Sequence, residues 1–246
     1  MEVLGIDIGG SGIKGAIVNT KTGELVGERH RIPTPKPATP KNIAKTIKEI
    51  VEHFNWKGKA GCCFPTPLAH GKCQSGGNLH ETWKDVQVDD LFKEKTGLEF
   101  TVLNDADAAG AAEMSFGAGK GKDGLVIIIT LGTGIGSGIF FNGSLVQNTE
   151  LGHVTYKSEA FEIYAADSAR KRDDLTYKQW GKRLNKYFNH VNLILSPDLF
   201  IIGGGASKKL YKFIEYIDID TPIIPAENKN EAGIIGAALA AEIGIK

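Results

Sequence analysis

The sequence predicts an α/β protein. A strand, a glycine-rich turn and a second strand follow one another twice, over residues 3–18 and 125–141. Between and after these units, short β-branched runs alternate with segments whose apolar residues recur every three or four positions, as in amphipathic helices. The 246 residues are enough for one large domain or two small ones.

The composition is that of an ordinary globular protein, with 41% hydrophobic and 24% charged residues. Lys plus Arg and Asp plus Glu both number 29, so the net charge is zero and no nucleic-acid partner is expected. No apolar run is long enough for a bilayer, and a strand from about Val3 leaves no space for a signal peptide. We therefore expect a cytoplasmic protein without a membrane partner. Its three cysteines, an odd number without CxxC spacing, predict reduced thiols and no zinc site: Cys62, Cys63 and Cys73.

The first strand, Val3–Ile8, leads into the turn Gly9–Gly12, and a second strand follows at Ala16–Val18. Glycine lets a backbone approach a ligand closely, and successive free N–H groups in such a turn bind anions. A carboxylate beside a phosphate site suits Mg²⁺ and a lysine suits the phosphate, so Asp7 and Lys14 are candidate contacts. Two unrelated hairpins are the alternative explanation of this turn and the next one.

The second unit begins with Leu125–Ile129, a continuous apolar run typical of a strand buried on both faces. The stretch 131–138 follows, with glycine at alternate positions and hydroxyl side chains between them. Ile139–Phe141 resumes a strand, and Asn142-Gly143 indicates a two-residue hairpin. A structural turn would also explain this stretch, but its likeness to the first turn favours two phosphate-binding turns.

The remaining elements follow from apolar spacing and from cap residues. Thr39-Pro40 predicts a helix start, because threonine caps helices and proline suits the first helical position. Thr176 predicts another start, and residues 68–84 are expected to be mostly irregular. Further strands are expected at Leu25–Ile32, Ala60–Phe64, Phe100–Leu103, Leu199–Ile202 and Pro222–Pro225, and helices over about 40–54, 91–97, 105–116, 176–195 and 235–243.

Three polar groups lie where a ligand would bind. Asn104-Asp105 follows a buried strand, whose carboxyl end faces the ligand crevice of α/β proteins. Asp105 could instead cap the next helix, although a catalytic role is favoured. Glu150 and His153 follow the second hairpin and could hold acceptor hydroxyls, with a structural histidine as the alternative. Gly203–Gly205 opens a further helix and suits a nucleotide or a phosphate.

These motifs together resemble a known family. The stretches 7–14 and 131–136 resemble the two phosphate motifs of the sugar kinase, Hsp70 and actin superfamily. Asn104-Asp105 with Glu150–His153 resembles the ROK sugar kinases, and stretches such as 77–80 and 148–153 resemble their polyphosphate-using branch. The resemblance covers nearly the whole chain. Most ROK kinases carry a cysteine-rich zinc motif after the histidine, and its absence here fits that branch.

The resemblance implies two ribonuclease H-like domains around a cleft, and usually a homodimer. A small N-terminal domain is expected at residues 1–116, completed by a returning C-terminal helix at about 231–246. A large C-terminal domain is expected at 117–230, after the boundary that the polar stretch 120–124 indicates.

The resemblance also assigns the site residues. Asp105 is the catalytic base, and Asp7 orients Mg²⁺, through water. The sugar-binding residues are Asn78, Asn104, Glu150, His153 and Glu162. The donor phosphates or nucleotide are held by Asp7, Gly9, Gly10, Ser11, Gly12, Lys14, Gly132, Thr133, Gly134, Gly136, Gly203, Gly204 and Gly205.

We therefore expect a glucokinase that transfers a phosphoryl group from inorganic polyphosphate or ATP to the 6-hydroxyl of glucose. An ATP-only glucose or mannose kinase is one alternative. A sugar-responsive repressor is another, but it would need an N-terminal helix-turn-helix, for which the strand at Val3 leaves no room. Asn104-Asp105 and the Glu150/His153 pair argue against a chaperone-like ATPase.

Overall fold

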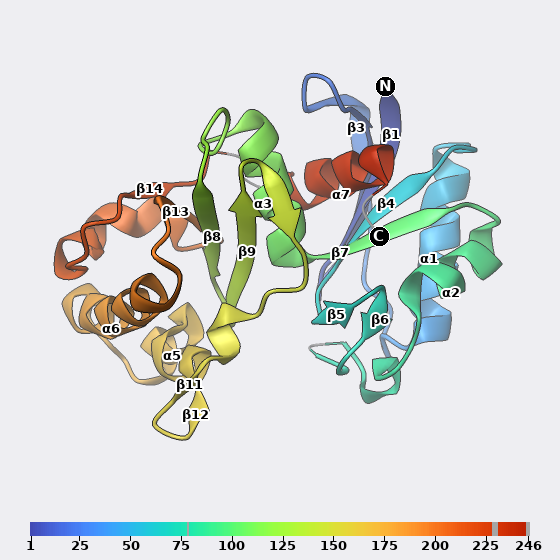
Figure 1. The fold of residues 1–246 in the computed structure, drawn as a ribbon. Coiled ribbons are helices and arrows are strands. Elements are labelled where there is room, and N and C mark those ends of the chain that lie inside the picture. The colour runs from blue at the N-terminus through green and yellow to red at the C-terminus, as the bar shows by residue number, and fades with distance from the viewer. Residues whose placement is uncertain (78, 228–230, 245–246) are drawn as a thin grey trace. The chain divides into compact units, whose positions relative to one another are not determined.

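The structure, a computed structural model, describes residues 1–77, 79–227 and 231–244 (Figure 1). The chain divides into two compact units: Met1–Ala112 with Asn230–Lys246, here called unit 1, and Glu113–Lys229, here called unit 2. Each unit contains a five-stranded sheet with helices, so the predicted α/β class is confirmed.

The sheet of unit 1 has the strand order β3-β2-β1-β4-β7. β1, β2 and β3 pair antiparallel, whereas β4 and β7 run parallel to β1. The elements of the unit are β1 (Glu2–Ile8), β2 (Ile13–Asn19), β3 (Glu24–Ile32), α1 (Pro40–His53), β4 (Ala60–Phe64), β5 (Leu68–Ala69), β6 (Lys72–Cys73), the 3-10 helix η1 (Glu81–Trp83), α2 (Val88–Thr96), β7 (Phe100–Asn104), most of α3 (Asp105–Phe116) and α7 (Ala232–Ile243).

The sheet of unit 2 has the order β10-β9-β8-β13-β14, with β8, β9 and β10 antiparallel and β13 and β14 parallel to β8. Its elements are β8 (Leu125–Leu131), β9 (Ile135–Phe141), β10 (Ser144–Val146), η2 (Leu151–His153), β11 (Thr155–Tyr156), β12 (Glu159–Ala160), α4 (Phe161–Ala165), α5 (Asp167–Arg172), α6 (Tyr177–Leu195), β13 (Leu199–Gly203), η3 (Ser207–Lys212), η4 (Ile214–Tyr216) and β14 (Ile223–Pro225).

The two sheets share one topology. In each, an antiparallel three-stranded meander comes first. Its first strand pairs with one parallel strand, which in turn pairs with a second parallel strand at the edge of the sheet. The two glycine-rich turns occupy the same topological position, because one joins β1 to β2 and the other joins β8 to β9. The repeat that the sequence indicated at the turns therefore extends to both sheets.

The helix starts expected at Thr39 and Thr176 are confirmed. The Thr39 side chain accepts a hydrogen bond from the Asn42 N–H, and Pro40 is the first residue of α1. Thr176 and Gln179 form a capping box at the start of α6, in which each side chain bonds the other residue's backbone N–H. The apolar residues that predicted the two helices are buried: Ile43, Ile47, Ile50 and Val51 on α1, and Trp180, Leu184, Tyr187, Phe188 and Val191 on α6.

Helix α7 packs directly on the backbone of its neighbours in unit 1 (Figure 1). A Cβ atom at Gly5 of β1 would overlap the carbonyl oxygen of Ile234, and one at Gly61 of β4 would overlap that of Ala237. On the other side, a Cβ at Gly236 would overlap the carbonyl oxygen of Ala108 on α3. The last helix is thus a close-packed part of this unit's core.

Two segments differ from the sequence expectations. Residues 155–174, in which no element was predicted, form the hairpin β11–β12 and the short helices α4 and α5. The helix expected after Gly205 is the 3-10 helix η3 rather than an α-helix. Its buried Leu210 is followed by buried Phe213, and a spacing of three fits the 3-10 period.

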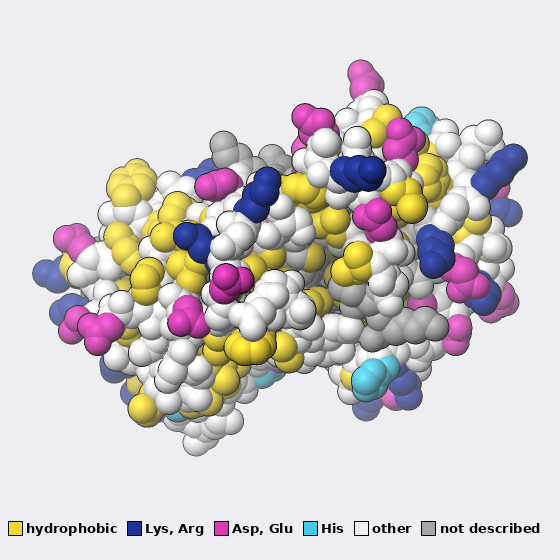
Figure 2. All heavy atoms as spheres, turned by 45° about the horizontal axis from the view of Figure 1, so that its top comes forward, with side chains coloured by type: hydrophobic (Ala, Val, Ile, Leu, Met, Phe, Trp, Pro, Cys, Tyr) yellow, Lys and Arg dark blue, Asp and Glu magenta, His cyan; other side chains and the backbone are white. Residues whose placement is uncertain are grey.

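Surface and thiol properties agree with the composition. Basic and acidic side chains are interspersed on the face drawn in Figure 2, as a zero net charge suggests. All three cysteines are free, as predicted, and all three are buried. Within the described ranges, none of the helices combines the length and the apolar character needed to span a bilayer.

Candidate active site

The first glycine turn is closed by a backbone bond from the Gly9 N–H to the Gly12 carbonyl, at 3.1 Å. Two side chains hold two of its other carbonyls: the Thr34 hydroxyl donates to Gly9 O, and Arg31 Nη2 donates to Ser11 O at 2.8 Å. A Cβ at Gly10 would meet no protein atom within 4 Å, so the space above this residue is open. The turn therefore has a fixed backbone and a free outer side.

Asp7 and Lys14 flank this turn as cross-strand partners on β1 and β2. Lys14 Nζ lies 3.1 Å from Asp7 Oδ2, and both side chains keep about a quarter of their surface exposed, at 27% and 21%. The structure thus pairs the two predicted ligand contacts with each other. Burial, followed by the charge of Asp7, raises the pKa of both Cys62 and Cys63, so these neighbouring thiols stay protonated.

Asn104 ends β7 and its Oδ1 accepts a hydrogen bond from the Asp107 N–H at 2.6 Å, which is the bond of a helix cap. The capping role that Asp105 might have had in the sequence therefore belongs to Asn104. Asn104 itself is buried. Asp105 is the first residue of α3 and keeps an exposed side chain.

The environment of Asp105 raises the pKa of its carboxyl group above the ordinary value. Desolvation by the surrounding protein is the largest cause, even though the side chain still touches solvent. The Asp7 carboxylate raises the pKa further, and a hydrogen bond from the Ala106 N–H opposes the shift. A carboxylate with a raised pKa is a better proton acceptor once it is ionised.

In unit 2, the three remaining sugar-binding candidates come together. His153 Nδ1 lies 3.5 Å from Glu150 Oε2, and His153 Nε2 lies 3.9 Å from Glu162 Oε1. The second carboxylate oxygen of Glu162 accepts a hydrogen bond from the Ile135 N–H at 3.0 Å. Glu162 therefore joins this cluster to the end of the second glycine turn.

The turn and the cluster are also connected through Ser137 on β9. Its buried hydroxyl donates to Thr149 O at 2.8 Å and accepts from the Leu151 N–H at 2.9 Å. A Cβ at Gly152 would overlap the Ile135 carbonyl oxygen, so glycine is required between Glu150 and His153. These contacts fix the cluster on the strand that leaves the turn.

Gly203–Gly205 lies beside the start of the same turn. Gly203 pairs with Thr130 across the parallel strands β13 and β8. Gly204 has a φ of +73°, and a Cβ there would lie 2.8 Å from the Leu131 carbonyl oxygen. Unit 2 thus brings its two glycine motifs next to each other.

One predicted sugar-binding residue cannot be compared with the structure, and three residues that contact the glycine turns were not predicted from the sequence. Asn78 lies outside the described residues. Among the described residues, no group of three or more His, Cys, Asp and Glu side chains could hold a metal ion. No sequence pattern indicated Thr34, Arg31 or Ser168, because each contributes through a bond to a backbone carbonyl far away in the chain.

Two meanders with phosphate-type glycine turns, and a polar cluster after the second, define the class of sugar kinases with a duplicated ribonuclease H-like fold. The chain belongs to the ROK family, whose family model matches residues 3–166. The resemblance that the sequence indicated is therefore confirmed.

The chain is also similar to individual proteins of this family. The polyphosphate glucokinase of Mycobacterium tuberculosis (strain CDC 1551 / Oshkosh) is 44% identical over 238 residues, covering 96% of this chain and 90% of the relative. The crystal structure of an inorganic polyphosphate/ATP-glucomannokinase from Arthrobacter sp. strain KM matches with 43% identity and a TM-score of 0.90 over 99% of each chain. A ROK family glucokinase from Streptomyces griseus, solved with glucose and AMPPNP, matches 99% of this chain and 100% of that chain. Its TM-score is 0.82 at 22% identity, which supports the fold alone.

Proposed function

We propose that this protein is a glucokinase that transfers a phosphoryl group from inorganic polyphosphate or ATP to the 6-hydroxyl of glucose. The observation that carries the proposal is the position of Glu162. One of its carboxylate oxygens bonds to the second glycine turn and the other faces His153, so a phosphate-type turn and a hydroxyl-binding cluster adjoin within unit 2. The names of the two relatives at 44% and 43% identity support the same donor and acceptor.

Phosphoryl transfer requires mainly positioning and electrostatic stabilisation from the protein. In the proposed mechanism, Asp105 accepts the proton of the 6-hydroxyl and orients the attacking oxygen. Asn104, Glu150, His153 and Glu162 bind the other hydroxyls of glucose, and Asn78 has the same role by resemblance. The glycine turns bind the phosphates of the donor through backbone N–H groups.

We propose that Asp7 takes part in Mg²⁺ binding, and the donor chemistry of this residue fits. Mg²⁺ in kinases is usually held by one or two carboxylates together with substrate phosphates and water. Asp7 offers a partly exposed carboxylate on the strand that leads into the first turn. Lys14 bonds to one oxygen of this carboxylate, Oδ2. Each carboxylate oxygen can accept a second hydrogen bond, so a metal-bound water can still donate to Asp7. When bound, Mg²⁺ would neutralise charge on the donor phosphates.

The homodimer that the family resemblance implies stays a prediction.

A donor panel with purified protein tests the proposed function directly. We expect glucose 6-phosphate to form from long-chain polyphosphate and from ATP when Mg²⁺ is added. Mannose belongs in the acceptor panel, because one relative is named a glucomannokinase. No phosphorylation of glucose from polyphosphate would contradict the polyphosphate assignment, and an ATP-only kinase would be the remaining reading.

The exposed lysines after Gly205 provide a sharper test of polyphosphate binding. Lys208 and Lys209 lie on η3, next to the glycine motif. A long polyanion contacts several cations, and screening weakens each exposed contact. We expect Lys208→Ala/Lys209→Ala, and high salt in the wild type, to raise the KM for polyphosphate more than the KM for ATP. The matched control is Lys178→Ala/Lys182→Ala, which removes two exposed lysines from α6. Equal changes for both donors would contradict a polyphosphate track on η3.

Gly10 tests whether the first turn binds a donor. The space around a Cβ at this position is empty of protein atoms, so Gly10→Ala should leave the melting temperature nearly unchanged. The added methyl group would, however, stand beside the backbone N–H groups proposed to bind phosphate. We expect the KM for the donor to rise roughly tenfold or more, the loss of one charge-assisted hydrogen bond or more, while the KM for glucose changes little. An unchanged donor KM would argue against phosphate binding at this turn.

A further inference from the structure

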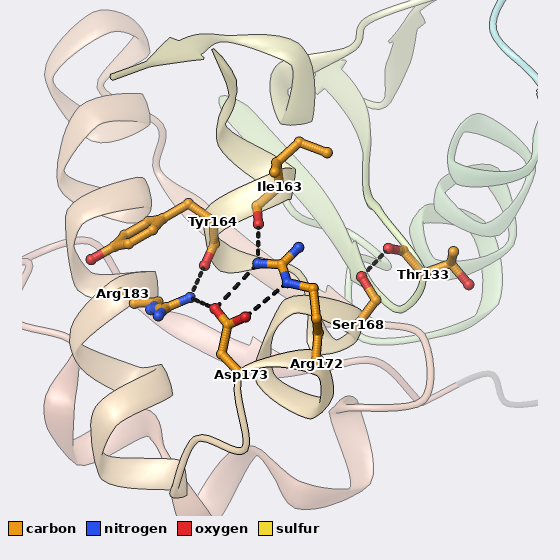
Figure 3. Close-up of polar contacts among 7 residues, drawn as sticks. All are labelled: Thr133, Ile163, Tyr164, Ser168, Arg172, Asp173 and Arg183. Atoms are coloured by element: carbon orange, nitrogen blue, oxygen red, sulfur yellow. Dashed lines mark hydrogen bonds and ion pairs between the residues drawn. The ribbon is translucent and has the colours of Figure 1, made fainter. Parts of the chain in front are cut away.

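The peptide groups of the second glycine turn are held from one side by a single residue. The Ser168 backbone N–H donates to Gly132 O at 3.1 Å, and the Ser168 hydroxyl donates to Thr133 O (Figure 3). The next carbonyl, that of Gly134, accepts from the Gly132 N–H at 3.1 Å. Three consecutive carbonyls therefore have fixed acceptor bonds within the protein.

This arrangement determines where the N–H groups point. A trans peptide is planar, and its N–H is directed opposite to its C=O. With the carbonyls of Gly132 and Thr133 directed at Ser168, the N–H groups of Thr133 and Gly134 are directed away from it. Neither of these two N–H groups donates to an acceptor in the part of the chain that the structure describes. Two adjacent free donors of this kind form an anion-binding site.

The first turn uses a similar device. The Thr34 hydroxyl holds Gly9 O, which directs the Gly10 N–H to the opposite side. Arg31 holds Ser11 O and so directs the Gly12 N–H in the same manner. In both turns a side-chain hydroxyl outside the glycine motif thus orients a peptide whose N–H faces outward.

An ion-pair network links the ends of α4 and α5, the helix that carries Ser168 (Figure 3). Arg172 donates to Ile163 O at 2.9 Å, and Arg183 of α6 donates to Tyr164 O at 3.0 Å. Asp173 bonds both arginines, at 2.8 Å and 2.6 Å. These hydrogen bonds lower the pKa of Asp173 to about 2, so its carboxylate is charged at neutral pH.

We infer that Ser168 is a positioning residue for the phosphoryl donor, with Thr34 in the corresponding role at the first turn. The ligand class is the terminal phosphate of a nucleoside triphosphate or of polyphosphate. The inference rests on the proposed function, because it assumes that the turns bind the donor. Each hydroxyl acts through the peptide that it orients, and the oriented N–H groups meet the phosphate oxygens.

The test is the steady-state kinetics of Ser168→Ala and Thr34→Val, each with both donors. We expect the donor KM to rise roughly tenfold, equivalent to about 1.4 kcal/mol, with the glucose KM unchanged. The conservative variants Ser168→Thr and Thr34→Ser keep the hydroxyl and should restore most of the donor affinity. Calorimetric titration with inorganic tripolyphosphate, without glucose, should show the same loss and rescue independently of turnover.

The matched control is Thr96→Val on α2. It removes a hydroxyl that donates to Phe92 O at 2.7 Å, a bond of the same type on a helix with no proposed site residue. An unchanged donor KM in Ser168→Ala, or an equal rise in the glucose KM, would overturn the inference. An equal loss in Ser168→Thr would overturn it as well. Failure of the proposed function is distinguishable, because the wild type itself would then phosphorylate no glucose.

Discussion

Asp105→Asn is expected to lower kcat for glucose phosphorylation by roughly 10²–10⁴-fold, the usual contribution of a positioned general base. The substitution is nearly isosteric and removes only the proton acceptor. Because Asn104 provides the helix cap, the start of α3 should remain intact. We therefore expect the fold and most of the affinity for glucose to be retained, as measured by melting temperature and by calorimetric titration with glucose.

The pH profile gives a second measurement of the same role. The pKa of Asp105 is raised, chiefly by desolvation, so this carboxylate ionises at a higher pH than an ordinary aspartate. A base works only when ionised, so kcat/KM should fall as the pH falls through this raised pKa. The acidic limb should therefore lie above the ordinary range of aspartate, and it should be lost from the residual activity of Asp105→Asn.

Asp90→Asn is the matched control for this experiment. Asp90 is an exposed aspartate in the first turn of α2, so it also lies near a helix start and has the same side chain, but it has no proposed role. Its kcat and pH profile should equal those of the wild type. Turnover of Asp105→Asn within a few-fold of the wild type would remove Asp105 from the mechanism.

The parts of the fold that the sequence predicted correctly have strong local signals. Thr39 and Thr176 start helices because their side chains accept hydrogen bonds from free N–H groups of the first helical turn, and Pro40 has the backbone angle that a first helical residue needs. These contacts involve no distant residues. Asn142-Gly143 predicts its hairpin because both residues tolerate the left-handed conformation, and their φ values are 49° and 77°. The composition of long buried strands such as β8, a continuous run of apolar and β-branched residues, also predicts them.

The segment before α6 could not be predicted, for physical reasons. The β11–β12 hairpin turns at Lys157-Ser158, whose φ values are 51° and 71°, although neither residue favours that conformation. The helices α4 and α5 have five and six residues, too few to show a helical period. Their position depends on Arg172, Asp173 and Arg183, which is a tertiary arrangement.

The candidate site was predictable where its glycines or its polar side chains are neighbours in the sequence. The two glycine turns, Asn104-Asp105 and the Glu150/His153 pair could be found from adjacent residues. The placement of Glu162 came from a family resemblance, and the structure now puts its carboxylate 3.9 Å from His153 Nε2. The Asp7–Lys14 ion pair follows from strand register, which a sequence pattern does not specify at one residue's precision.

Gly61→Ala is expected to lower the stability of unit 1 strongly. The new Cβ would overlap the Ala237 carbonyl of α7, and backbone atoms cannot rotate away as a side chain can. The helix cannot shift easily, because its Ile234 carbonyl lies against Gly5 of β1 and its Gly236 lies against the Ala108 carbonyl of α3. We expect the free energy of unfolding to fall by about 3 kcal/mol, the upper part of the usual cost of overpacking.

For a chain of this length, that loss corresponds to a melting temperature lower by roughly 6–12 °C. Gly10→Ala is the matched control, since the same methyl group in the same unit meets no protein atom within 4 Å. There the loss of unfolded-chain entropy should leave the unfolding free energy within about 1 kcal/mol of the wild type, or slightly above it. A melting temperature for Gly61→Ala equal to that of Gly10→Ala would mean that α7 does not pack on β4 at backbone distance. The contrast between the two variants separates the glycines that the fold requires from those that leave the first turn open to a phosphate.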